Sequence, residues 1–313
     1  MDPDTEIAFD FQPYLRQYKS GRVVRYGGEP VVPTGTDPVT GVVSRDVHAG
    51  DGARARVYLP PGAAADANAK LPVVVYFHGG AFVTGSPARP LTHAYLNDLV
   101  SRSGAIGVSV YYRLAPESPL PAAYDDAWAA VRWAATRGAG GDTWLLNHAN
   151  MSRGVFLAGC SAGANIAHEM AVRCAGAGVA LRGLVLVHPY FAGEEAIGGE
   201  TEDLVERRRR TWRFTCPDTP GLDDRRLNPF VDGEARAAAA AIPCERVLVC
   251  VAEKDYKLKD RGLWYYRELK GSGYGGEVEL FESMSVGHAF HFGMLDSRQA
   301  VQLQERTVAF IKK

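Results

Sequence analysis

Apolar runs of strand length recur through this chain, and segments of helical spacing lie between them. The runs occupy residues 53–59, 71–77, 105–112, 154–159, 181–187, 246–252 and 276–283. Most are continuous and rich in β-branched residues, which is typical of strands covered on both faces. Helical patterns occupy residues 92–103, 122–135, 161–176, 258–273 and 297–313. This alternation predicts an α/β fold, with a mostly parallel sheet and helices on both of its faces.

Two segments interrupt the alternation. Residues 1–40 lack a core strand pattern, and residues 190–240 read as an irregular, charged insertion between two buried strands. Ligands of open α/β sheets bind beyond the carboxyl ends of the strands, where such extra material usually lies. We therefore expect both segments to form a cap over that end. Neither has enough apolar residues for its own core, so residues 1–313 are expected to form a single domain.

The charge balance gives no sign of a polyanionic partner. The net charge is −1, and 23% of the residues are charged, so no global field attracts nucleic acid or an anionic membrane. The basic run from Arg207 to Trp212 is expected to be a solvated helix face, with anion binding as the alternative. We expect no nucleic-acid or membrane partner, and the sequence leaves the oligomeric state open.

The first residues and the cysteines indicate a reducing compartment. The N-terminal segment is acidic and has no apolar stretch of signal-peptide length. No window reaches the roughly 18 apolar residues of a membrane span. The five cysteines are odd in number and form no C-x-x-C pair, which argues against a disulfide framework and against a zinc site. The cytoplasm is the expected location, with the nucleus as a further compartment.

The motif Gly159-Cys160-Ser161-Ala162-Gly163 lies where a buried strand gives way to a helix. It fits G-x-S-x-G, in which a serine stands on a strained turn above the strand end. The flanking glycines are needed because bulky side chains would obstruct that turn. The amide after the serine then points at a reacting carbonyl oxygen, assisted by the helix dipole. Taken alone the pattern is weak, because a glycine-softened turn also explains it.

A second glycine motif supports the first. His78-Gly79-Gly80-Ala81-Phe82 follows the most apolar strand. Glycines at this position let backbone N–H groups face a substrate oxygen without obstruction from side chains. The alternative is an ordinary tight turn, which the downstream serine makes a poor explanation.

A serine hydroxyl needs a base, and the base needs an orienting acid. Asp255 follows the strand at 246–252, and His288 lies in the loop after the strand at 276–283. This gives the chain order serine, acid, histidine, with the acid after a late strand and the histidine before the last helix. The sequence therefore predicts a serine hydrolase.

Competitors for both roles have simpler explanations. Asp260 lies at a helix start, where a carboxylate stabilises the N-terminus. His291 lies beside an aromatic cluster, where it is expected to pack. The other histidines apart from His78 have no catalytic setting and are expected to be structural: His48, His93, His148, His168 and His188.

With these residues in hand, the chain resembles the plant carboxylesterase branch of the hormone-sensitive lipase family from about residue 40 onward. The blocks that carry the likeness are HGGAF, YYRLAPESPLPAAYDDAWAAVRW, FLAGCSAGANIAHEMA, CPDTPGLDDRRLNP, VLVCVAEKD and GHAFHF. The resemblance implies an α/β-hydrolase fold of about eight strands with a cap, and hydrolysis of small carboxylic esters without cofactor or metal. It assigns Ser161 as the nucleophile that forms the acyl-enzyme, His288 as the base and Asp255 as the acid.

The resemblance also implies that the N–H groups of Gly79, Gly80 and Ala162 form the oxyanion hole. One departure from the family is Cys160, where an aspartate usually precedes the nucleophile. A thiol is a much weaker hydrogen-bonding partner than a carboxylate. We expect this change to retune the turn around Ser161 and to leave the three catalytic residues intact.

Other functions remain open at this stage. Gibberellin receptors resemble this family but have lost the catalytic histidine, and some relatives are dehydratases that act on phenolic or isoflavonoid substrates. A pure scaffold would not explain a complete set of catalytic residues. The natural ester is not evident from the sequence, and five aromatic residues of the cap segments either line the pocket or anchor the cap: Phe9, Phe11, Tyr14, Trp212 and Phe214.

Overall fold

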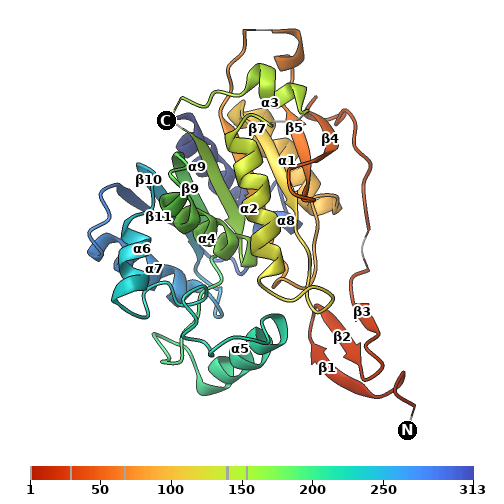
Figure 1. Ribbon diagram of the computed structural model, residues 1–313, viewed down its shortest axis with the longest axis vertical. Helices are drawn as coiled ribbons and strands as arrows, with labels where there is room; N and C mark the ends of the chain where they lie inside the picture. Colours follow the sequence, from red (N-terminus) through yellow and green to blue (C-terminus); the bar gives the residue numbers. More distant parts are fainter. Residues whose placement is uncertain (1, 29, 67, 139–140, 153) are drawn as a thin grey trace.

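The computed structural model describes residues 2–28, 30–66, 68–138, 141–152 and 154–313. An eight-stranded sheet at its centre has the order β11-β10-β9-β8-β6-β7-β5-β4 (Figure 1). The strands are β4 (Val43–His48), β5 (Arg54–Leu59), β6 (Val73–Phe77), β7 (Ile106–Tyr111), β8 (Val155–Cys160), β9 (Leu181–Val187), β10 (Arg246–Ala252) and β11 (Glu277–Ser283). Neighbours from β11 to β7 pair in parallel, and β5 and β4 add to that edge in antiparallel fashion. The predicted mostly parallel sheet is confirmed.

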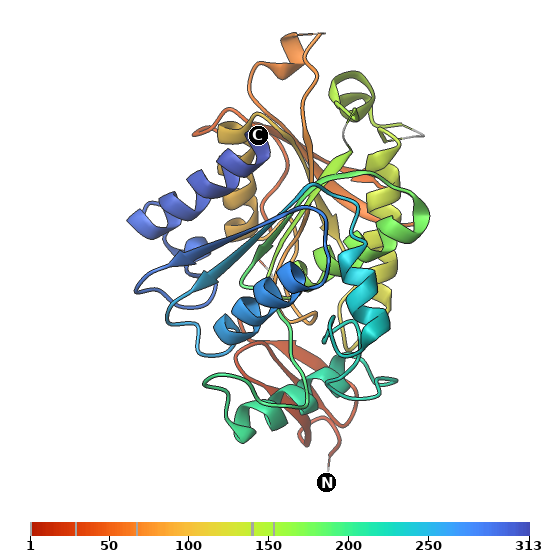
Figure 2. The same ribbon diagram turned by 90° about the vertical axis from the view of Figure 1, so that its left-hand side faces the viewer.

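Helices cover both faces of this sheet. One face carries α1 (Pro90–Ser103), α8 (Phe290–Gly293) and α9 (Arg298–Lys312), and the other carries α2 (Ala122–Ala135), α4 (Ala162–Ala177), α6 (Gly233–Ala240) and α7 (Lys259–Gly271). A short helix, α3 (Thr143–His148), precedes β8. Figure 2 shows α9 and α2 on opposite sides of the sheet. In the part of the chain that the structure describes, no helix has the length and apolar content of a membrane span.

Strand β6 illustrates why both faces of the sheet need a layer of helices. Val73, Val75 and Phe77 belong to the core under α2 and α4, whereas Val74 and Tyr76 belong to the core under α1 and α9. Side chains that alternate along a strand point to opposite faces, so a continuous apolar run places apolar groups on both. The apolar runs predicted as strands correspond to β5–β11, and residues 181–187 and 246–252 match β9 and β10 to the residue.

The structure adds elements that the sequence patterns did not predict. Residues 1–40 contain a three-stranded antiparallel sheet of β1 (Ile7–Phe11), β2 (Leu15–Tyr18) and β3 (Val23–Arg25). Residues 190–240 are not irregular throughout, because they contain α6 and α5 (Glu202–Thr215). Both helices have side-chain N-caps: Thr201 accepts from the amide of Leu204, and Asp232 accepts from the amide of Ala235. The helix face expected at Arg207–Trp212 is part of α5, whereas the rest of α5 and the whole of α6 were not predicted.

The small sheet and α5 lie together at one end of the molecule (Figures 1 and 2). The rings of Phe9 and Phe214 stack there, with centroids 4.2 Å apart and an interplanar angle of 14°. This contact joins segments that are about two hundred residues apart in the sequence. Aromatic residues of β1 and α5 thus hold the two segments to each other.

The basic run of α5 is only partly the solvated face that was expected. Arg207 and Arg210 are exposed, but Arg208 is 4% exposed and Trp212 is fully buried. Arg208 is buried because it has polar partners inside: it forms an ion pair with Glu200 and donates to the carbonyl oxygen of Lys257. A buried guanidinium needs such partners to offset its lost hydration.

Candidate active site

Ser161 occupies the turn between β8 and α4, with φ 56° and ψ −120°. Hydrogen bonds to the neighbouring chain hold this strained backbone: its amide donates to the carbonyl of Val187 (2.9 Å), and its carbonyl accepts from the amide of Tyr190 (3.2 Å) as well as from amides of the first turn of α4. The glycines of the motif are required by close packing. A Cβ on Gly159 would lie 2.2 Å from the carbonyl oxygen of Gly163, which no real side chain tolerates. The turn therefore presents the serine hydroxyl at the carboxyl end of the sheet.

The structure brings Ser161, His288 and Asp255 together. Oγ of Ser161 lies 3.1 Å from Nε2 of His288, and Nδ1 of His288 lies 2.6 Å from Oδ2 of Asp255. Since an ionised carboxylate only accepts hydrogen bonds, Nδ1 of His288 carries the proton and donates a hydrogen bond to Asp255. Nε2 is then the acceptor for the serine hydroxyl. This geometry lets the imidazole take the serine proton while the carboxylate fixes its tautomer.

Asp255 is 3% exposed and is held by the backbone that follows it. Its Oδ1 accepts from the amides of Lys257 and Leu258, each at 3.2 Å. Burial acts to raise the pKa of Asp255, but the hydrogen bond and the charge of His288 act against it, and the pKa lies below its usual value of 3.8. The carboxylate is therefore ionised at neutral pH.

His188 is a residue of this site that the sequence reasoning assigned to a structural role only. It directly follows β9, has a positive φ of 47° and is 1% exposed. Its Nδ1 accepts from the amide of Ala289, next to His288, at 3.1 Å, and the two imidazole rings lie 5.6 Å apart. Burial, followed by the neighbouring histidines His291 and His288, keeps the pKa of His188 well below its usual value, so it is a neutral acceptor. The sequence feature that could have identified His188 as a site residue is its position at the carboxyl end of a buried strand.

The predicted oxyanion-hole amides lie beside the serine. Among the described residues, the amides of Gly79 and Gly80 donate to no other backbone group. A Cβ on Gly79 would lie 3.0 Å from the carbonyl oxygen of Cys160, and one on Gly80 would lie 2.0 Å from that of Thr84. Glycine at 79 lets the loop pack against the turn of Ser161, and glycine at 80 lets the loop fold back closely on Thr84. Donors left free in this way are available to an oxygen anion.

His78 supports this loop from behind. Its ring stacks on Tyr112 with centroids 4.2 Å apart, and the Tyr112 hydroxyl donates to the His78 carbonyl at 2.7 Å. Burial lowers the pKa of His78 to about 4, so the ring is neutral. His78 is 1% exposed and packs under the loop that carries Gly79 and Gly80.

The competitor residues have other partners. Oδ2 of Asp260 accepts from the amide of Gly199 at 2.8 Å, at the start of α7. His291 is 2% exposed and packs between Tyr95 and Phe292, with centroid distances of 5.4 Å and 4.2 Å. Neither side chain reaches the hydroxyl of Ser161 through any contact of the described residues.

Two cavities meet at the serine. A cavity of about 510 Å³ is lined by Gly79, Gly80 and Ser161, and a smaller one of about 230 Å³ is lined by Ser161 and Asp255. Tyr14 and His288 line both. Of the five aromatic residues expected to line the pocket or anchor the cap, Tyr14 and Phe11 line a cavity, and the other three line neither of these two. Phe9 stacks on Phe214, and Trp212 is buried in the main core, where its ring contacts that of Phe82.

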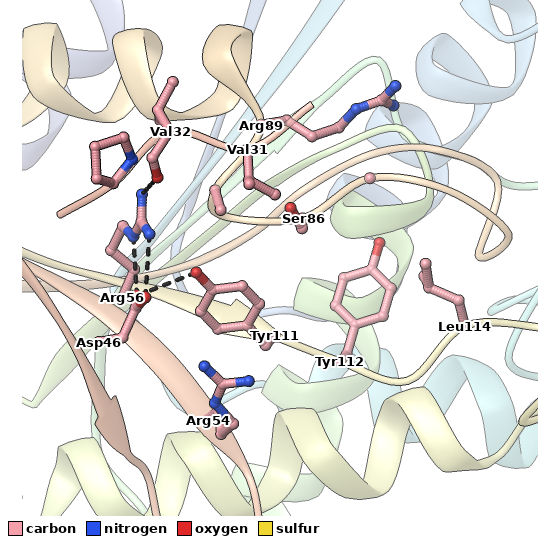
Figure 3. Close-up of a pocket in the computed structure, with 13 residues that line it drawn as sticks. Val31, Val32, Asp46, Arg54, Arg56, Ser86, Arg89, Tyr111, Tyr112 and Leu114 are labelled. Atoms are coloured by element: carbon pink, nitrogen blue, oxygen red, sulfur yellow. Dashed lines mark hydrogen bonds and ion pairs between the residues drawn. The ribbon is translucent and has the colours of Figure 1, made fainter. Parts of the chain in front are cut away.

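A third cavity, of about 670 Å³, lies away from the serine (Figure 3). Arg56 crosses it and is fully partnered: it forms two hydrogen bonds with Asp46, at 2.9 and 3.1 Å, and one with the carbonyl of Val32 at 3.0 Å. The hydroxyl of Tyr111 donates to the same carboxylate at 3.1 Å. These bonds tie the N-terminal segment to β4, β5 and β7, which is a structural role.

Cys160 is 1% exposed and lies in the core shared by Tyr76 and Tyr95. Burial, followed by the charges of Asp255 and Cys250, raises the pKa of its thiol above the usual value. The thiol is therefore protonated at neutral pH and is a poor nucleophile. The turn presents the neighbouring serine hydroxyl instead.

One cluster of the described residues has the spacing of metal ligands. Ligand atoms of His188, Asp255 and His288 all lie within 4.8 Å of one another. Two of these residues already bind each other through the 2.6 Å hydrogen bond, and the Nδ1 of His188 accepts from the amide of Ala289. These ligand atoms are therefore already engaged in the hydrogen bond between His288 and Asp255 and in the hydrogen bond that holds the loop of His288.

Comparisons with known proteins identify the family to which the chain belongs. A family model for the alpha/beta hydrolase fold matches residues 74–292. The chain is 42% identical to tuliposide A-converting enzyme 2, chloroplastic, of Tulipa gesneriana, over 99% of this chain and 80% of that protein. It is 40% identical to probable carboxylesterase 13 of Arabidopsis thaliana, over 99% of each. Among solved structures, the thermostable carboxylesterase EstE1, cloned from a metagenomic library, is similar with a TM-score of 0.71 and 27% identity, over 91% of this chain and 90% of that one.

Proposed function

Because this chain belongs to the α/β-hydrolase family and is a carboxylesterase of the plant type, we propose that Ser161 is its nucleophile. His288 is the general base, and Asp255 orients the imidazole. The observation that carries this proposal is the pair of hydrogen bonds, 3.1 Å and 2.6 Å long, that links the three side chains. The amides of Gly79, Gly80 and Ala162 form the oxyanion hole.

The reaction is acyl transfer in two steps. Nε2 of His288 takes the proton of the Ser161 hydroxyl as its oxygen attacks the ester carbonyl, and the oxyanion hole stabilises the tetrahedral state. The protonated imidazole then gives the proton to the leaving alcohol, and the acyl group stays on Ser161. Water, deprotonated by the same imidazole, attacks the acyl-enzyme and releases the acid. One water is consumed, and the enzyme returns to its starting state.

A fluorophosphonate probe tests this assignment. The probe reacts with an activated serine, so we expect a single labelled peptide that contains Ser161, with no label on Ser152 or Ser285 in the same digest. An ester panel of increasing acyl length, measured in parallel, reports turnover. A folded protein that hydrolyses esters but carries the label elsewhere would contradict the nucleophile. A protein that takes no label and hydrolyses no ester would favour a receptor.

We also propose that residues 1–40 and 190–240 form a cap on a single domain that spans residues 1–313. The supporting observations are the stacking of Phe9 on Phe214 and the presence of Tyr14 in both cavities. Tyr14→Ala is expected to join the cavities and to shift the preferred acyl length in the ester panel. Tyr18→Ala is the control, because this residue of β2 packs its ring under Arg22 and lines neither cavity. An unchanged acyl preference in Tyr14→Ala would contradict the cap.

The cellular location is a further proposal. The sequence favours the cytoplasm, with the nucleus as a further compartment. The names of the tulip relatives place those proteins in the chloroplast or amyloplast. The names of the Arabidopsis relatives state no compartment. Imaging of the chain fused at its C-terminus to a fluorescent protein tests the cytoplasmic assignment. Fluorescence confined to plastids would overturn it.

A further inference from the structure

The two cavities at Ser161 differ in charge. Of the described residues, Arg89 is the single charged side chain in the wall of the larger one apart from the imidazole. Within the same part of the chain, the smaller one is lined by five charged side chains: Arg207, Arg208, Lys254, Asp255 and Lys257. Four of these are cations, and the one carboxylate already serves His288. The smaller cavity is therefore electropositive, although the whole chain has a net charge of −1.

The innermost cation belongs to a buried cluster with excess positive charge. Arg208 and Arg261 are 4% and 2% exposed, and both form ion pairs with Glu200. Arg261 binds this carboxylate through Nε at 2.9 Å and through Nη2 at 2.7 Å. Among the described residues, no second carboxylate lies within ion-pair distance of either guanidinium. Two buried cations thus share one anion, and the uncompensated charge lies beside the cavity that Arg208 lines.

The outer cations are also short of partners. Lys254 and Lys257 are exposed and form no ion pair with any described residue. Arg207 has one distant partner, Asp203 at 3.7 Å, and both of these side chains are mostly exposed. Cations grouped around a partly enclosed cavity attract an anion more strongly than the same cations spread over a surface. The sequence left anion binding open for the basic run of α5. The two arginines of that run that line the smaller cavity, Arg207 and Arg208, are the ones to which this alternative applies.

We propose that the smaller cavity binds the half of the ester substrate that bears an anionic group of the carboxylate class. This inference rests on the proposed function, because the cavity shares Ser161 and His288 with the reacting centre. Arg208 supplies buried positive charge at the wall, and Lys254, Lys257 and Arg207 supply exposed charge at the mouth. The larger cavity takes the uncharged half.

Matched pairs of esters test the proposal, one pair for each half of the substrate. For the acyl half, the pair is the monomethyl ester of adipic acid and the methyl ester of its half-amide. For the alcohol half, the pair is 4-acetoxybenzoate and 4-acetoxybenzamide. In each pair a carboxylate is exchanged for a neutral group of the same shape. We expect kcat/KM to favour the carboxylate by about tenfold in one pair, which identifies the half that the cavity holds.

Charge variants connect that preference to the cavity. Lys254→Glu and Lys257→Glu, made separately, are expected to reduce the carboxylate to carboxamide ratio of kcat/KM severalfold. Lys312→Glu is the control, because this exposed lysine lies at the end of α9, away from both cavities. Raising the salt concentration should reduce the ratio of the unmodified enzyme as well, because salt screens exposed charges.

Three outcomes would overturn the proposal: no carboxylate preference in either pair, a preference that Lys312→Glu reduces as much as the cavity variants do, or a preference that salt leaves unchanged. In all three the neutral esters are still hydrolysed and Ser161 is still labelled, so the catalytic assignment survives. Loss of hydrolysis of every ester together with loss of labelling would instead contradict the proposed function.

Discussion

Gly163 lies directly against the backbone of Phe77, so that a Cβ on this glycine would be 2.0 Å from the Phe77 carbonyl oxygen. This contact seats the first turn of α4 on the end of β6. It therefore fixes the distance between the Ser161 turn and the loop that carries Gly79 and Gly80. The second glycine of the motif sets the geometry of the oxyanion hole as well as that of the nucleophile.

Gly163→Ala is expected to destabilise the protein by about 1–3 kcal/mol and to reduce kcat, because the added methyl must push α4 away from β6. Gly176→Ala is the matched control on the same helix, since nothing lies within 4 Å of its Cβ position. That change is expected to stabilise the protein by about 0.5–1 kcal/mol. Urea unfolding measures both, and equal stability of the two variants would contradict the close contact.

Asp255 should contribute to stability at neutral pH and lose that contribution in acid. Its pKa in the folded protein lies below the usual 3.8, so its ionised form is favoured by folding. The contribution is present above pH 3.8 and is lost as the pH falls through the lower folded value. We expect the difference in free energy of unfolding between the wild type and Asp255→Asn to shrink over that range. Asp218→Asn, at an exposed aspartate, controls for the effect of the substitution itself, and a difference between the wild type and Asp255→Asn that grew in acid would contradict the assignment.

His188 is expected to position the loop of His288 rather than to react. His188→Ala removes the acceptor for the Ala289 amide and should lower kcat on the order of tenfold or more, because small misplacements of a catalytic group are costly. Fluorophosphonate labelling should become slower but remain at Ser161. His168→Ala is the control: its Nδ1 pairs with the hydroxyl of Tyr265, and it lines neither cavity at the serine. If both variants retained the wild-type kcat, the positioning role would be excluded.

Cys160 should be replaceable without loss of the reaction. No hydrogen bond of its thiol is found among the described residues, so Cys160→Ser is expected to keep kcat within about tenfold. Cys160→Asp should also keep measurable turnover, since the hydroxyl of Tyr76 in the same core lacks a partner within the described structure. Cys250→Ser is the control for the loss of stability that follows from replacing a buried thiol, because Cys250 is buried and lines neither cavity. A folded but inactive Cys160→Asp would contradict the supporting role of this position.

The strands and the order of the site residues could be predicted because they depend on local pattern. A continuous apolar run such as residues 246–252 needs cover on both faces, and this requirement fixes a buried strand in a layered fold. Asp255 and His288 follow late strands, and parallel strands bring such loops to the same edge. The structure has Asp255 within hydrogen-bonding distance of His288, and His288 within hydrogen-bonding distance of Ser161.

The features that were missed depend on contacts between distant segments. His188 acquires its role from the amide of Ala289, which lies about a hundred residues later in the chain. Arg208 is buried because Glu200 and the carbonyl of Lys257 meet it there, and the charge pattern of α5 contains no sign of either partner. The strands β1–β3 are short and carry few buried side chains, so their sequences resemble loops.

The central claim is that the Ser161 hydroxyl, activated by His288 and Asp255, performs the reaction. The most direct measurement is kcat of Ser161→Ala with p-nitrophenyl acetate, alongside substrate binding and far-UV circular dichroism to verify the fold. We predict that kcat falls by roughly 10⁴-fold or more while binding is largely retained. A correctly folded Ser161→Ala protein that still hydrolysed this ester at a substantial fraction of the wild-type rate would contradict the account.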